Sequence, residues 1–188
     1  MNVPYTSERR PDTGVTNVTM GVWLFLASEV MLFGALFSAY ALLRVSAPAW
    51  PSGRDVLDLK MGGLNTAIIL LSTALVWRAS RMASTPGRPV IVSTLLAVAF
   101  LASKAFEYHD DVARGLVPST NTFLAMYFTL TGLHVLHVVG GAIANIWLLA
   151  GVRRVDMRMT TGRARGIALY WMFVDIVWLV IFSLFYLS

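Results

Sequence analysis

Long runs of apolar residues alternate with short polar segments along most of this chain. Five of these runs approach or exceed the roughly 20 residues that an α-helix needs to cross the hydrocarbon core of a membrane. We predict membrane-spanning helices at Met20–Arg44, Met61–Ser80, Pro89–Tyr108, Asn121–Ala150 and Ala164–Leu187. Because the connections are short, residues 20–188 are expected to form a single all-α domain, a multi-pass bundle of five transmembrane helices.

The composition is that of a membrane protein. Of 188 residues, 57% are hydrophobic and 13% are charged, whereas a soluble domain has about 45–50% apolar and about 25% charged residues. Residues 1–19 are polar and contain Pro4 and Pro11, so we expect a polar tail and a retained first helix rather than a cleaved signal peptide. The absence of cysteine excludes disulfides, cysteine-ligated clusters and c-type haem attachment.

The basic residues are distributed unequally between the two ends of the predicted bundle. Cytoplasmic loops carry the excess of lysine and arginine, so the arginine-rich end is expected to face the cytoplasm. The arginines at that end are Arg9, Arg10, Arg78, Arg81, Arg88, Arg153, Arg154, Arg158, Arg163 and Arg165. This places the amino terminus in the cytoplasm and the carboxyl terminus outside. The net charge of +5 then points to anionic lipid headgroups, not nucleic acid, as the partner of these loops.

Four ionisable side chains lie deep within the apolar runs, where such groups are costly and usually functional. Glu29 is roughly 13 Å into the first helix and Asp175 roughly 16 Å into the last, both counted from the cytoplasmic side. His134 and His137 lie in the middle of the fourth helix, and their three-residue spacing puts them on one face. A polar cluster of these four residues near the midplane is geometrically possible.

Such a cluster has several interpretations. It is either a hydrogen-bonded network that fixes helix packing, or a functional element: a proton relay, a lipid site or a contact that tunes a neighbouring subunit. Ligation of a metal or haem by His134 and His137 is disfavoured, because a bis-histidine haem needs imidazoles from opposing helices. The remaining histidine, His109, lies at the outer end of the third helix. We therefore assign no catalytic, cofactor-binding or metal-binding residue.

A charged segment ends the third predicted helix. Lys104 and Glu107 can pair at their three-residue spacing, and His109 follows. We expect this segment to be an interfacial anchor, with Lys104 extending outward to the headgroups, or alternatively a docking surface.

Five stretches, one in each helix, carry a resemblance to a known family. In chain order they are Gly21–Gly34 (GVWLFLASEVMLFG), Leu64–Ser72 (LNTAIILLS), Lys104–Tyr108 (KAFEY), Leu130–Gly141 (LTGLHVLHVVGG) and Tyr170–Trp178 (YWMFVDIVW). The chain resembles subunit III of the haem-copper cytochrome c oxidases over nearly its whole length. It looks like the short bacterial form, which lacks the first two of the seven helices of the mitochondrial form.

The resemblance implies a subunit without a redox centre of its own. In the family this subunit binds the flank of subunit I, preserves its activity over many turnovers, supports proton uptake and binds phospholipid. Glu29 falls on the buried glutamate that reacts with carbodiimides in the family, and Glu107, His134, His137 and Asp175 also fall on recurring positions.

The chain departs from the family pattern in two respects. The last helix of the family usually reads Tyr-Trp-His-Phe-Val-Asp, but Met172 stands at the histidine position, which replaces a hydrogen-bond donor and acceptor with a polarisable apolar side chain. The missing first two helices also remove the family's V-shaped lipid cleft.

We therefore expect a non-catalytic subunit of a bacterial plasma-membrane oxidase. Subunit I is the expected direct partner, with subunit II and other subunits in the same complex, and these partner subunits would hold the haem and copper. The proton-pumping complex would transfer electrons from cytochrome c to oxygen. The first alternative is the related subunit associated with nitric oxide reductase. A stand-alone small transporter or proton channel is disfavoured by the lack of internal repeats, and an independent redox enzyme by the lack of cysteine and of opposed histidines.

Overall fold

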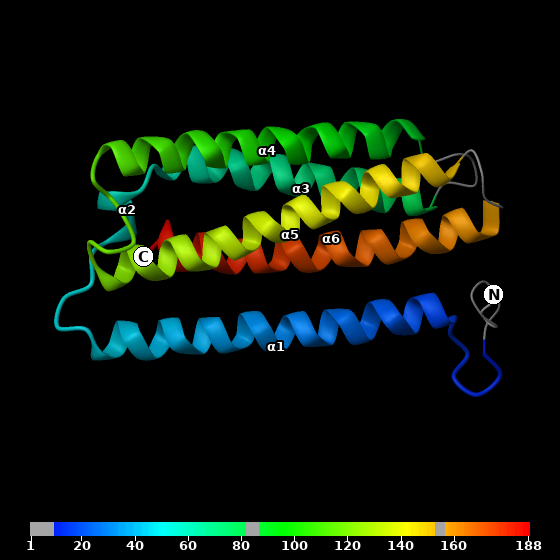
Figure 1. The fold of residues 1–188 in the computed structure, drawn as a ribbon, viewed down its shortest axis with the longest axis horizontal. Coiled ribbons are helices and arrows are strands. Elements are labelled where there is room, and N and C mark those ends of the chain that lie inside the picture. Colours follow the sequence, from blue (N-terminus) through cyan, green and yellow to red (C-terminus); the bar gives the residue numbers. More distant parts are fainter. Residues whose placement is uncertain (1–9, 82–86, 153–156) are drawn as a thin grey trace.

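The computed structural model describes residues 10–81, 87–152 and 157–188, without the side chains of residues 152–161. The helices are α1 (Asn17–Ser46), α2 (Gly53–Val56), α3 (Leu59–Arg81), α4 (Gly87–Ala113), α5 (Thr122–Val152) and α6 (Met157–Phe185) (Figure 1). The predicted tail as far as residue 9, together with Arg153 and Arg154, lies outside the described residues, as does the side chain of Arg158.

The predicted all-α membrane fold is confirmed. Within the described ranges there are helices and no strands, and five helices are long and apolar enough to cross a membrane: α1, α3, α4, α5 and α6. The single-turn helix α2 lies in the connection between α1 and α3 and was not predicted. Helix α4 continues to Ala113, beyond the predicted end at Tyr108, so residues expected at its end lie inside it.

Helix α6 occupies the centre of the bundle. It packs against α1, α3 and α5, whereas α4 packs against α3 and α5. Figure 1 shows α1 along one side, next to α6. The buried residues of α1 are Leu26, Phe33 and Tyr40, and their spacing of seven keeps them on one narrow line along the helix. Many other apolar side chains of α1 are exposed, among them Trp23, Met31 and Leu42, and this surface is available to lipid or to another protein.

Polar side chains fix where three of the long helices begin. Thr16 Oγ1 accepts a hydrogen bond from the Thr19 backbone N–H (3.2 Å). Asp58 Oδ1 accepts a hydrogen bond from the Lys60 backbone N–H (2.8 Å), and Asn121 Oδ1 accepts one from the Leu124 backbone N–H (2.8 Å). These caps satisfy backbone donors that have no partner within the helix. They set the start of α1, α3 and α5 and thereby the register in which polar side chains of neighbouring helices meet.

The carboxyl-terminal end of α6 is held by the elements around it. Tyr40 on α1 donates its hydroxyl to the Leu184 carbonyl (2.8 Å), and the Gly53 backbone N–H donates to the Ser188 carbonyl (3.1 Å). Gly53 approaches so closely that a Cβ there would lie 1.5 Å from the Phe185 carbonyl oxygen. This backbone contact admits only glycine, and it joins α2 to the end of α6.

Candidate functional site

Glu29 on α1 and His137 on α5 form a hydrogen-bonded pair near the middle of the bundle. Glu29 Oε2 lies 2.8 Å from His137 Nε2, and His137 Nδ1 lies 2.7 Å from the Leu133 carbonyl oxygen. A carbonyl can only accept, so Nδ1 must carry a proton and donate it. The 2.8 Å contact then requires one further proton, carried either by Nε2 or by the carboxyl of Glu29. The pair therefore holds one shared proton.

The surroundings of this pair orient the imidazole and leave it within reach from outside. The edge of Phe33 packs on the His137 ring, with ring centroids 5.0 Å apart, and the hydroxyl of Tyr170 donates to the His137 carbonyl (2.7 Å). The side chains of His137 and Glu29 retain 12% and 14% exposure. The pair therefore lies at a seam between α1 and α5 that a neighbouring molecule can reach.

His134 does not join this pair. Its ring is fully buried and packs against Phe100 (5.7 Å between centroids) and Trp178 (5.1 Å), on α4 and α6. Neither ring nitrogen makes a hydrogen bond within the described part of the chain. Asp175 is also separate, because it lies on α6 against Thr73 of α3.

The four ionisable residues therefore do not form the single cluster that the sequence allowed. Glu29 and His137 form one pair, whereas His134 and Asp175 lie at two other places in the bundle. Residues three apart on a helix differ by about 60° in direction. On α5 this difference directs His137 toward α1 and His134 toward the interior between α4 and α6.

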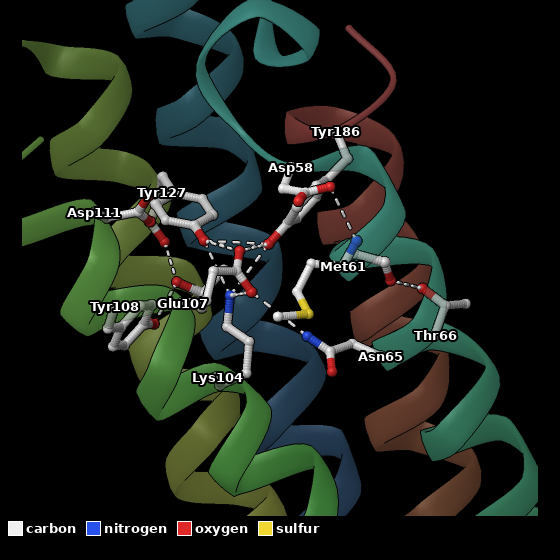
Figure 2. Close-up of polar contacts among 12 residues, drawn as sticks. Asp58, Met61, Asn65, Thr66, Lys104, Glu107, Tyr108, Asp111, Tyr127 and Tyr186 are labelled. Atoms are coloured by element: carbon white, nitrogen blue, oxygen red, sulfur yellow. Dashed lines mark hydrogen bonds and ion pairs between the residues drawn. The ribbon is translucent and has the colours of Figure 1, made fainter. Parts of the chain in front are cut away.

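A second polar site, more extensive, lies in the half of the bundle toward α2. Figure 2 shows Lys104 and Glu107 of α4 meeting Tyr127 of α5, Tyr186 after α6 and Asn65 of α3. We call these five residues the ion-pair network. Lys104 Nζ lies 3.1 Å from Glu107 Oε2, 3.0 Å from the Tyr127 hydroxyl and 3.1 Å from that of Tyr186. Each donor of the ammonium group thus has an acceptor.

The carboxylate of Glu107 is equally well satisfied. Its Oε1 accepts from the hydroxyl of Tyr127 (2.6 Å) and from that of Tyr186, and its Oε2 faces Lys104 and the Asn65 amide nitrogen (3.4 Å). The Lys104 ammonium also lies over the ring of Tyr108, 4.9 Å from its centroid, an added cation–π attraction. A buried ion pair is tolerated in an apolar bundle only with such additional hydrogen bonds.

The prediction that this segment is an interfacial anchor is wrong for Lys104 and Glu107. Both side chains are buried, with 1% and 5% exposure, whereas His109 is exposed. Because α4 continues to Ala113, Lys104 lies about 13 Å from the helix end, too deep to extend outward. The three-residue spacing of Lys104 and Glu107 was the sequence signal for this ion pair. No sequence pattern indicated that Tyr127 and Tyr186 would hydrogen-bond to it.

Sequence reasoning also missed a chain of buried polar contacts in the other half of the bundle. The Ser72 and Ser93 hydroxyls lie 2.8 Å apart, the Asn145 amide nitrogen donates to Ser93 Oγ (3.3 Å), and Trp171 Nε1 donates to Asn145 Oδ1 (3.3 Å). These residues join α3, α4, α5 and α6. Hydrogen bonds between helices are one of the forces that hold membrane bundles together.

Comparison with known proteins places this architecture in a family. The family model for cytochrome c oxidase subunit III matches residues 10–188. A cytochrome bo(3) ubiquinol oxidase subunit 3 of Pseudomonas aeruginosa is 34% identical over 180 residues, covering 91% of this chain and 85% of the relative. A cytochrome c oxidase subunit 3 of Synechocystis is 33% identical over 175 residues, covering 89% and 74%.

A third relative has a different organisation. The haem-copper oxidase subunit I+III of Aeropyrum pernix is 32% identical over 183 residues, which cover 90% of this chain but 22% of that longer protein. The family match spans nearly the whole described chain, including both polar sites. The chain therefore belongs to the cytochrome c oxidase subunit III family and is a membrane-embedded subunit III of a haem-copper terminal oxidase.

Proposed function

We propose that the chain supports the catalytic subunit of a bacterial terminal oxidase and takes no part in electron transfer itself. The observation that carries the proposal is the Glu29–His137 pair, which holds one proton near the middle of the bundle at an accessible seam between α1 and α5. A buried proton-sharing pair of this kind can exchange a proton with a neighbouring protein without any metal or haem in its own chain.

Subunit I is the proposed direct partner, with subunit II and other subunits in the same complex. The fused subunit I+III of Aeropyrum pernix supports this choice, because its name joins the two subunits in one polypeptide. Haem and copper would reside in the partner subunits. Relatives are named both as ubiquinol and as cytochrome c oxidases, so the proposal concerns reduction of oxygen and leaves the electron donor open.

The proposed location is the bacterial plasma membrane, with the amino terminus in the cytoplasm. The arginine-rich loops support this orientation. At that end Arg81 stacks on Trp77, 4.7 Å from its ring centroid, and Arg163 stacks on Trp147 at 4.3 Å. Aromatic rings at the membrane interface hold these guanidinium groups at headgroup level, where phospholipid phosphates would accept their hydrogen bonds.

Glu29→Gln is expected to separate support of turnover from catalysis. The amide keeps a hydrogen bond to His137 but has no acidic proton to share. We expect initial oxygen consumption of the complex within about twofold of wild type, a barrier change below about 0.4 kcal/mol, and fewer turnovers before activity falls by half. Oxygen consumption followed to inactivation measures both quantities. Complete loss of initial activity in a fully assembled complex would refute the supporting role.

Glu29 is also expected to react with a hydrophobic carbodiimide in native membranes. Such reagents attack a protonated carboxyl in an apolar setting, and the shared proton of the pair can reside on Glu29. Peptide mapping of the labelled chain should locate the adduct between residues 17 and 46, on α1. Equal labelling of a Glu29→Ala protein would show that the reactive carboxyl lies elsewhere.

A further inference from the structure

The imidazole of His134 is buried without a hydrogen-bond partner. The residue is fully buried on α5, and neither ring nitrogen makes a hydrogen bond with any residue that the structure describes. A neutral imidazole always carries one N–H donor and one acceptor nitrogen. An apolar interior penalises both when they have no partner. The ring therefore calls for a hydrogen-bonding partner beyond the side chains that surround it.

The two aromatic rings that pack on His134 cannot satisfy both nitrogens. The Trp178 ring is tilted by 32° from the imidazole plane, and the Phe100 ring by 80°. The face of an aromatic ring can accept an N–H weakly, but it offers no donor to the second nitrogen. Trp178 carries one donor, Nε1–H, and this donor already serves Thr66 Oγ1 at 2.9 Å. At least one nitrogen of His134 therefore needs another donor.

Asn65 brings a second unsatisfied atom to the same part of the bundle. It precedes Thr66, the residue to which Trp178 donates. The Asn65 amide nitrogen faces Glu107 Oε2 at 3.4 Å, and Figure 2 shows its oxygen on the side away from Glu107. That oxygen is buried and has no hydrogen-bond partner among the described residues. Exchanging the two amide atoms would only turn the oxygen toward a carboxylate, so Asn65 Oδ1 also needs a donor.

These residues lie in one layer across four helices. Phe100 packs against Trp178 as well as against His134, with 5.1 Å between the Phe100 and Trp178 ring centroids. We call the following residues the Trp178 layer: Asn65 and Thr66 of α3, Phe100 of α4, His134 of α5 and Trp178 of α6. His134 and Asn65 are each 0% exposed, so neither a lipid nor a helix of another subunit can reach them. Water is small enough to enter, and it both donates and accepts hydrogen bonds.

We propose that the Trp178 layer binds internal water, which hydrogen-bonds to the imidazole of His134 and donates to Asn65 Oδ1. Buried water typically makes about three hydrogen bonds to polar groups that lack other partners. Bound here, it extends the ion-pair network from Asn65 to His134. His134 also interacts electrostatically with Lys104 and with His137, so the water lies between the two polar sites of the bundle. The inference does not depend on the proposed function.

Solid-state NMR of the full chain in lipid, with nitrogen-15 in its histidines, tests for this water directly. The chain has three histidines. His134→Phe identifies the His134 signals by their loss, and His109→Gln with His137→Gln identifies them by exclusion if that variant does not fold. We expect magnetisation from water protons to reach the His134 nitrogens, with the exposed His109 as positive control. Transfer to His109 without transfer to His134 would show a dry layer and overturn the proposal.

A double-mutant cycle tests whether one hydrated site joins the two residues. The variants are His134→Phe, which keeps an aromatic ring without nitrogens, Asn65→Leu, and the two combined. We expect both single variants to unfold at lower SDS concentration than wild type, because each takes hydrogen bonds away from the bound water. The shift of the double variant should be smaller than the sum of the single shifts, since the two residues share that water.

Two outcomes of the cycle would contradict the proposal. If the layer is dry, His134→Phe removes two unsatisfied nitrogens, and the variant should unfold at higher SDS concentration than wild type. If the shifts of the single variants add up to that of the double variant, His134 and Asn65 do not share a ligand.

Discussion

Replacing Lys104 with methionine is expected to lower the free energy of unfolding by about 3–5 kcal/mol, the cost of removing one member of a buried ion pair. The methionine fills similar space but supplies none of the three donors that Lys104 gives to Glu107, Tyr127 and Tyr186. Glu107 would then keep its hydrogen bonds from Tyr127 and Tyr186 but would hold a buried charge without its counter-charge.

Unfolding of the purified chain in mixed micelles, titrated with SDS and followed by circular dichroism, measures this loss. The matched control is Lys60→Met, the same change at the exposed lysine of α3, for which we expect less than about 0.5 kcal/mol. The double variant Lys104→Met with Glu107→Gln should recover part of the loss, because it removes the unpaired charge. A Lys104→Met chain that unfolds within about 0.5 kcal/mol of wild type would show that the ion-pair network adds little to stability.

Gly62→Ala is expected to destabilise the chain by about 1–3 kcal/mol through overpacking. A Cβ at this position would lie 2.6 Å from Cδ1 and 2.7 Å from Cε1 of the Tyr186 ring. That ring cannot yield cheaply, because its hydroxyl is held by Glu107 and Lys104 at the other end. The substitution therefore pushes on the Tyr186 ring and strains the ion-pair network, although neither Lys104 nor Glu107 is changed.

The adjacent residue provides the control for this prediction. Gly63 lies in the same helix, but a Cβ there meets nothing within 4 Å. Gly63→Ala should therefore be neutral or stabilising by as much as about 1 kcal/mol, the helix preference of alanine over glycine. The same SDS titration compares the two variants. Equal stability of both alanine variants would mean that Tyr186 is not fixed where the network places it.

The fold was predictable because membrane-spanning helices can be recognised from hydropathy along the chain, without knowledge of how the helices pack. Hydropathy and length alone located the five long helices, since each must bury its backbone polar groups within itself to cross the membrane. Helix ends were less predictable. The third helix was predicted to end at Tyr108, where the apolar run stops, but α4 continues to Ala113. Asp110 and Asp111 in this added turn both pair with Arg114.

The polar sites were predictable only in part, because they depend on direction as well as depth. Glu29 and His137 were identified, and they meet. His134 was identified at the correct depth, but its direction toward Phe100 and Trp178 depends on which helices surround α5, and hydropathy does not contain that information. Lys104 was assigned to the wrong environment for the same reason, since its acceptors, Tyr127 on α5 and Tyr186 after α6, lie 23 and 82 residues away in the sequence.

The central claim is that this chain works as subunit III beside the catalytic subunits of an oxygen-reducing oxidase. The most direct test is affinity purification of the tagged chain from native membranes in mild detergent, followed by a visible haem spectrum and assays of oxygen consumption and nitric oxide reduction. We predict that haem-bearing subunits and oxygen reduction co-elute with the chain. A colourless chain eluting alone, or an eluate that reduces nitric oxide but not oxygen, would contradict the account.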